Sequence, residues 1–238
     1  MNEKEFAFDR QMIEHLGEFP PSEEELRNTN PWSRPIGSIT WGFILTTLHL
    51  NFLYLQYILP IIGVVLIFLG FRSLRNENGF FKAAWVFSIV KLFLQMGNLV
   101  AYATPLRTAD TARLAMGAAV TAFQIAMFLV FHAALKEVYQ KAGRQAEGAP
   151  LLRAAWWTAA AFLVAISPLS ESWLVFIPMV IFYILIVRAL YRVGGELDEA
   201  GYVLTNAPVR VNNRTFGWTY FLLALAAVIA CSLWFNHL

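Results

Sequence analysis

Lys91 is the residue most able to do chemistry in this chain, because it is the only charged side chain well inside a predicted apolar helix. Polar side chains follow after four, seven and eleven residues, at Gln95, Asn98 and Tyr102. At helical spacing these positions share one face. Gln124 is expected at a similar depth on the next helix. Since an ionisable residue inside a membrane indicates a functional site by default, this polar stripe would bind a small polar ligand or conduct protons.

A structural role for Lys91 is the alternative. The inner parts of the predicted helices contain no Asp or Glu that would pair with Lys91 or relay a proton. Lysine side chains lean toward the N-terminal end of their helix, and Lys82 lies only about 13 Å away along the axis. Snorkelling of the ammonium toward that end, together with hydrogen bonds between helices, would explain the stripe without a ligand.

Other kinds of site have little support in the sequence. His49 and His132 are predicted in opposite leaflets, and His15 and His237 on opposite sides, so neither pair would hold one metal ion. The single cysteine, Cys231, excludes an internal disulfide and a multi-cysteine metal site. H-E-x-x-H, G-x-S-x-G and glycine-rich phosphate-loop motifs are absent. We therefore expect neither a metal nor another cofactor, and an enzyme is the least supported class.

The elements that must position the polar stripe are membrane-spanning helices. Residues 36–71 carry no charged side chain, and one straight helix of that length would measure about 54 Å. The hydrocarbon layer of a bilayer is about 30 Å thick, so this run must fold back on itself as a hairpin. The predicted fold class is all-α, a polytopic membrane helix bundle. Its seven transmembrane helices are expected near residues 33–51, 55–75, 80–103, 110–141, 151–167, 171–193 and 216–236, with a break at Ser167 and Pro168.

Basic residues predict how the bundle is oriented. Of the 18 Lys and Arg residues, 15 fall in the N-terminal segment and in the second, fourth and sixth connections. The alternate connections hold only Arg107 and Arg113, and Lys91 is the remaining one. Cytoplasmic loops carry the excess of Lys and Arg, so the N-terminus is predicted inside and the C-terminus outside.

The first 31 residues are predicted to be an acidic cytoplasmic tail, and residues 32–238 the transmembrane domain. Residues 1–30 contain three basic and eight acidic side chains, a net charge of −5, which anionic lipid would repel. Fourfold spacing places Phe8, Met12 and Leu16 on one apolar helix face. This face and the acidic run are candidate docking elements for a cytoplasmic protein; the run consists of Glu23, Glu24 and Glu25. The alternative is a solvated lid on the chain's own domain.

A second docking candidate lies in the longest predicted cytoplasmic loop. Its segment A-G-Y-V-L-T-N-A-P-V-R-V, residues 200–211, contains Tyr202 and Arg210 and would otherwise lie against the inner head groups. This string resembles one found in uncharacterised bacterial multi-pass membrane proteins. So do the junction of Pro20, Pro21 and N-P-W at 30–32, and the segments at 51–60 and 70–75. The resemblance implies the bacterial plasma (inner) membrane, and for some such proteins a role as partners of extracytoplasmic sigma factors.

These observations support two functional hypotheses. The first is a signalling or regulatory scaffold of the inner membrane, anti-sigma-like through its tail and loops, with a cytoplasmic protein as partner and no direct contact with nucleic acid. The second is a small transporter or ligand-binding membrane protein built around the polar stripe. A cavity at Lys91 would favour the second hypothesis, and a tightly packed bundle with an ordered tail the first.

Overall fold

The computed structural model describes residues 31–48, 55–102, 110–143, 149–199, 204 and 211–236. The chain divides into two units, Met1–Asn30 and Pro31–Leu238, and all described residues belong to the second. The predicted docking residues lie outside the described part of the chain; they are Phe8, Met12, Leu16, Glu23, Glu24, Glu25, Tyr202 and Arg210.

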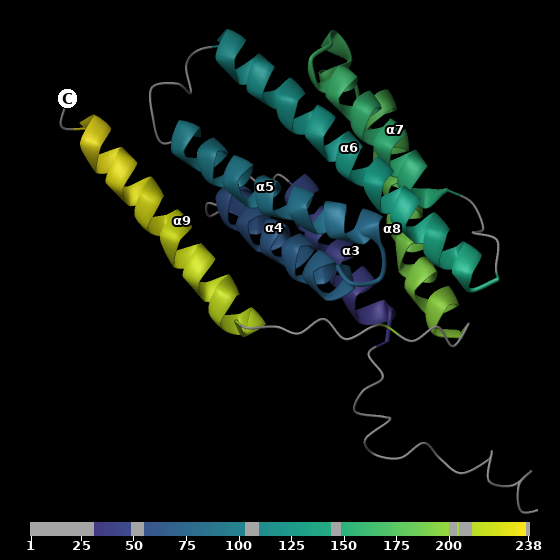
Figure 1. Ribbon diagram of the computed structural model, residues 1–238. Helices are drawn as coiled ribbons and strands as arrows, with labels where there is room; N and C mark the ends of the chain where they lie inside the picture. Colours follow the sequence, from purple (N-terminus) through teal and green to yellow (C-terminus); the bar gives the residue numbers. More distant parts are fainter. Residues whose placement is uncertain are drawn as a thin grey trace, which may run out of the picture. The chain divides into compact units, whose positions relative to one another are not determined.

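The described residues form seven α-helices and one short 3₁₀-helix, without a strand, which confirms the all-α prediction (Figure 1). The α-helices are α3 (Ser33–Thr47), α4 (Leu55–Leu74), α5 (Gly79–Tyr102), α6 (Asp110–Lys141), α7 (Pro150–Ala165), α8 (Trp173–Glu199) and α9 (Asn213–Asn236). Five of them, α4, α5, α6, α8 and α9, are long and apolar enough to cross a membrane. Helices α3 and α7 are shorter, with 15 and 16 residues.

The predicted break between the fifth and sixth helices is present. Helix α7 ends at Ala165, and Ser167 then caps the 3₁₀-helix η2 (Pro168–Glu171) by accepting a hydrogen bond from the Leu169 amide at 3.2 Å. Helix α8 continues to Glu199 rather than ending near residue 193. Tertiary contacts support these extra turns, because Leu197 is fully buried and Gly194 lies directly against Ser33.

Helices α3 and α4 approach each other until their backbones touch. A Cβ atom added to Gly63 would lie 2.7 Å from the Gly42 carbonyl oxygen, and one added to Gly42 would lie 2.6 Å from the Gly63 oxygen. Two turns further along α4, a Cβ atom on Gly70 would lie 2.8 Å from the Pro35 oxygen. Small residues at such positions are a typical device for packing helices within membranes. Glycine is therefore required at these contacts between α3 and α4.

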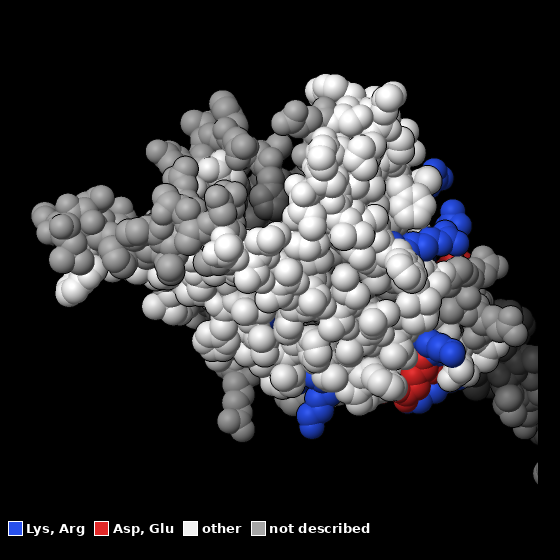
Figure 2. Space-filling view, turned by 90° about the horizontal axis from the view of Figure 1, so that it is seen from above, with Lys and Arg blue, Asp and Glu red and all other residues white. Residues whose placement is uncertain are grey.

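An aromatic cluster fills the space between these two helices and their neighbours. Trp32, Phe71, Phe81 and Phe131 are almost completely buried. The Phe71 and Phe131 rings meet edge to face, with centroids 5.0 Å apart. In contrast, many large apolar side chains on α8 and α9 are exposed, and Figure 2 shows a broad uncharged face with Lys, Arg, Asp and Glu gathered along its edge. Such a surface fits lipid contact.

Several hydrogen bonds join helix ends on one side of the bundle. They connect the end of α8 to the start of α3, the end of α4 to the start of α9, and the turn before α5 to the last third of α6; the pairs are Asp198 with Trp32, Arg72 with Asn213, and Asn78 with Ala134. Tyr139 near the end of α6 also donates to Glu196 of α8 at 2.8 Å. The predicted basic connections therefore start from one and the same side.

Asp198 supplies the N-terminal cap that α3 lacks in its own sequence. Trp32 occupies the capping position, but its side chain does not cap the helix. The Asp198 carboxylate instead accepts from the Trp32 amide at 2.5 Å and from the Ser33 amide at 3.1 Å. A negative charge at this end also interacts favourably with the helix dipole.

Asp198→Ala is expected to lower the free energy of unfolding by about 1–2 kcal/mol, as loss of a capping side chain does. Asp198→Asn keeps one acceptor oxygen, so its free energy of unfolding should lie between those of Asp198→Ala and the wild type. Thermal unfolding of the purified protein measures both. The neighbouring Glu199→Ala is the matched control, because Glu199 is exposed; equal effects of Asp198→Ala and Glu199→Ala would contradict a capping role.

Candidate functional site

A cavity of about 440 Å³ opens between α3, α5, α6, α7 and α8. This volume is in the range of small-molecule binding sites. Each of the five helices contributes at least one polar or amphipathic side chain to its wall. These residues are Thr40, Thr46, Thr47, Lys91, Gln95, Thr121, Gln124, Trp157, Thr158 and Tyr183.

Lys91 lies at the middle of α5 and extends across the cavity wall to α6. Its Nζ donates a hydrogen bond to Oε1 of Gln124 and lies 5.8 Å from the centroid of the Phe43 ring on α3. An amide oxygen and an aromatic face both stabilise an ammonium without neutralising it. No Asp or Glu is among the residues that line the cavity. The site therefore places a lysine among protein neighbours that carry no charge.

The threonines present oxygen and methyl groups to the cavity. Thr40 and Thr158 each donate their hydroxyl proton to the carbonyl four residues earlier, at 2.8 Å in both cases. This local bond satisfies the hydroxyl inside an apolar bundle. Donors toward a ligand include the Lys91 ammonium, the amides of Gln95 and Gln124, and the Tyr183 hydroxyl.

The rest of the wall is apolar and aromatic. The Trp157 indole is fixed by a hydrogen bond from Nε1 to the Met179 carbonyl oxygen at 3.0 Å. Its ring centroid lies 4.8 Å from that of Tyr183, whose hydroxyl is buried next to Thr47. Phe162 and Ile186 extend this surface along α7 and α8. A few polar groups on an apolar wall are typical of sites that bind amphipathic molecules.

The structure brings together three of the five residues of the predicted polar stripe. Lys91, Gln95 and Gln124 line the cavity. Asn98 is partly exposed on α5 and is not among the lining residues, and the side chain of Tyr102 lies outside the described part of the chain. Asn98 follows Lys91 by seven residues, about 10 Å along the axis. It shares the face of Lys91 but lies beyond the depth of the cavity.

The structure agrees in part with a purely structural role for Lys91. Its ammonium makes a hydrogen bond between helices, to Gln124, as that alternative expects. The ammonium lies beside side chains from the middle of α3 and α6, however, and does not extend toward the end of α5 that carries Lys82. Contact with the cavity and an interhelical hydrogen bond therefore coexist at this residue.

Sequence reasoning missed the residues of α3, α7 and α8 that complete the site. Tyr183 carried a usable signal, since it is the only hydroxyl-bearing residue in the run 173–187. The threonines of α3 recur at positions 40, 46 and 47 in an otherwise apolar segment. Phe43 and Trp157 carried none, because an aromatic residue in an apolar helix is usually a packing residue.

His132 lies on α6 and is partly buried. His15, His49 and His237 are outside the described residues. Within the residues that the structure does describe, no three His, Cys, Asp or Glu side chains come together in a group that would hold a metal ion.

Comparisons with protein-family models, with curated proteins and with solved structures gave no match. The site combines one lysine, two glutamines and an aromatic wall. The described residues around it are all-helical and include five helices apolar enough to cross a membrane.

Proposed function

We propose that this chain is a membrane-embedded binding protein for a small organic acid with an apolar body, in the class of ligand-binding proteins and small carriers. The observation that carries the proposal is the Lys91 ammonium, which lies at the wall of a 440 Å³ cavity without an acidic neighbour among the lining residues. A carboxylate would supply the missing negative charge, and the apolar body would lie against Trp157 and Phe162.

Energetic considerations support an anion over a neutral ligand. Hydrogen bonds to charged groups contribute about 1.5–3 kcal/mol, roughly twice the value for neutral pairs. Such a bond is strengthened where water is largely excluded. Gln95 and Gln124 flank Lys91 and have amide protons for a second carboxylate oxygen. The same geometry offers a cationic ligand only repulsion from Lys91.

A panel of matched carboxylic acids and alcohols tests this proposal directly. Each pair, such as 3-phenylpropionate and 3-phenylpropanol, shares its apolar body and differs only at the head group. We expect carboxylates to raise the melting temperature of the purified protein and their alcohols to have little effect. A panel in which alcohols or amines stabilise the protein as well as the acids would contradict an anion site at Lys91.

We further propose that all seven helices cross the bacterial plasma membrane, with the N-terminus inside. The 15-to-2 distribution of Lys and Arg supports this orientation. The hydrogen bonds among the ends of α4, α6 and α8, the starts of α3 and α9 and the turn before α5 support a common side for the basic connections.

Cysteine labelling tests the orientation. In a variant with Cys231 replaced by alanine, a single cysteine is introduced at Thr108 or at Thr205. A membrane-impermeant maleimide added to intact cells is expected to label position 108 and to leave position 205 unlabelled until the membrane is opened. Labelling of position 205 alone from outside would reverse the proposed topology.

A regulatory scaffold is the second candidate function. Its support is the net charge of −5 on residues 1–30 together with the Asp198 cap, which attaches the residue after this tail to α8, a helix of the cavity wall. If no carboxylate stabilises the protein and a cytoplasmic protein binds it only when the tail is present, regulation becomes the better account.

A further inference from the structure

A second groove lies between α4 and α9 and shares no residue with the Lys91 cavity. Its volume is about 430 Å³. Helix α4 contributes five aliphatic residues to its wall and α9 the remainder. In full, the wall consists of Ile58, Ile61, Ile62, Val65, Leu66, Asn213, Arg214, Gly217, Trp218 and Phe221.

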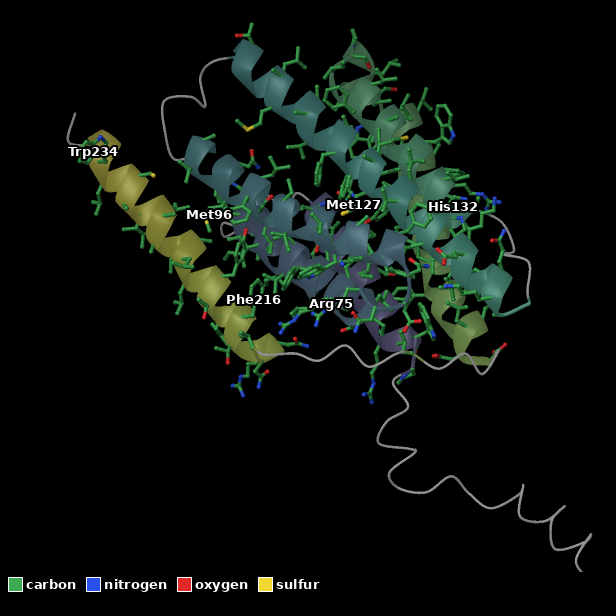
Figure 3. All side chains as sticks on the ribbon, in the orientation of Figure 1. Arg75, Met96, Met127, His132, Phe216 and Trp234 are labelled. Carbon is green, nitrogen blue, oxygen red and sulfur yellow. The ribbon has the colours of Figure 1, made fainter. Side chains whose placement is uncertain are left out.

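The groove exists because α9 contacts the bundle through a different face. Phe216, labelled on α9 in Figure 3, stacks on Phe68 of α4 with ring centroids 4.4 Å apart. Tyr220 donates a hydrogen bond to the Leu92 carbonyl of α5 at 2.7 Å. One turn further, Ala224 is fully buried. Gly217 and Trp218 follow Phe216 by one and two positions, so they lie on a different side of α9. Both line the groove. The missing side chain at Gly217 adds to the space.

The groove has one polar end and one apolar end. The aliphatic wall runs from Ile58 to Leu66, about 12 Å along α4. Asn213 and Arg214 lie at the end of the groove where α9 begins. A second arginine is held beside them, since Arg72 donates to the Val211 carbonyl at 2.6 Å and to Oδ1 of Asn213 at 3.4 Å. Arg214 is thus the basic residue that lines the polar end, and Arg72 lies buried next to Asn213.

We propose that this groove binds one anionic phospholipid, with its phosphate at Arg214 and part of an acyl chain along Ile58, Ile62 and Leu66. Both helices of the groove are long and apolar enough to cross a membrane, so its side opening would face lipid. Trp218, 59% exposed beside Arg214, fits the head-group region that indole prefers. A free phosphate ion would gain nothing from the aliphatic wall.

Native mass spectrometry of the full-length protein in detergent tests this site. The protein is mixed with equimolar phosphatidylglycerol and phosphatidylcholine of identical acyl chains. We expect the wild type to retain one phosphatidylglycerol with about fivefold preference, since a basic residue near the head groups contributes about this factor. Arg214→Gln should remove most of the preference, and Gly217→Leu should fill the groove and lower retention of both lipids.

Matched variants separate the site from general effects. Arg192→Gln removes an exposed arginine of α8 that does not line the groove, and should keep the preference. Gly217→Ala should bind like the wild type, because its Cβ atom would meet Val65 at 3.6 Å, an ordinary contact. Lys91→Met should also bind lipid normally, so the outcome is independent of the proposed ligand cavity.

Two results would overturn the proposal. One is equal retention of the two lipids by the wild type, which would make the groove an ordinary part of the lipid-exposed surface. The other is a preference that Arg214→Gln and Arg192→Gln leave equally intact. If Gly217→Leu fails to fold, the comparison of Arg214→Gln with Arg192→Gln still decides, because both side chains are exposed.

Discussion

Replacing Gly63 with alanine is expected to lower the free energy of unfolding by about 3 kcal/mol, the upper range for an overpacked core. The new Cβ atom would lie 2.7 Å from the Gly42 carbonyl oxygen and 2.9 Å from the Thr46 amide nitrogen. Both are backbone atoms, so no side-chain rotation relieves the clash, and α3 must move away from α4. Unfolding of the purified protein in mixed micelles with increasing denaturing detergent measures the change.

Gly97→Ala is the matched control. Gly97 lies inside α5, and a Cβ atom there would meet nothing within 4 Å. Alanine is the better helix former by about 1 kcal/mol, so this variant should be as stable as the wild type or slightly more so. If Gly63→Ala behaved in the same way, the backbone contact between α3 and α4 would not be a determinant of stability.

Lys91→Met is expected to reduce affinity for the organic acid roughly 10- to 100-fold, the factor that corresponds to one lost hydrogen bond to a charged group. Methionine has a similar length but carries no charge. The ligand-free protein should change little in melting temperature, because the substitution also removes the cost of partly burying an ammonium. Isothermal titration with the best carboxylate from the panel measures the affinity, and thermal unfolding measures the stability.

The two readouts distinguish a binding role from a structural one. A lysine that only joins α5 to α6 through Gln124 would lower the melting temperature when removed and leave ligand affinity unchanged. Lys82→Met provides the control on the same helix, since Lys82 is exposed and does not line the cavity. It should match the wild type in both measurements.

Helix positions were predictable where charge and apolar length mark the ends. The predicted segments at 55–75 and 110–141 agree with Leu55–Leu74 and Asp110–Lys141 to within one residue. The end of α8 was not predictable, because Glu196 and Asp198 look like loop residues in the sequence. In the structure Glu196 accepts a hydrogen bond from Tyr139, and Asp198 caps α3. These partners are 57 and 166 residues away in the chain.

The candidate site was predictable along one helix and not across five. Helical periodicity places Lys91 and Gln95 on one face, and both line the cavity. Periodicity gives no depth limit, so Asn98 appeared equivalent although it lies beyond the cavity. The contributions of Phe43, Trp157 and Tyr183 depend on how α3, α7 and α8 pack, which the spacing of residues in a single segment does not encode.

The glycine contact between α3 and α4 has a consequence for synthesis of the chain. Helix α3, with 15 residues, is about 22 Å long, less than the roughly 30 Å of a hydrocarbon layer. It also emerges from the ribosome before α4, whose Gly63 and Gly70 form the surface that fits it. In the nascent chain, residues 33–47 therefore lack this packing surface until about 25 further residues have been synthesised. Under the proposed seven-pass topology, the two helices would form one unit of membrane insertion, in which the second helix determines when the first is stably placed.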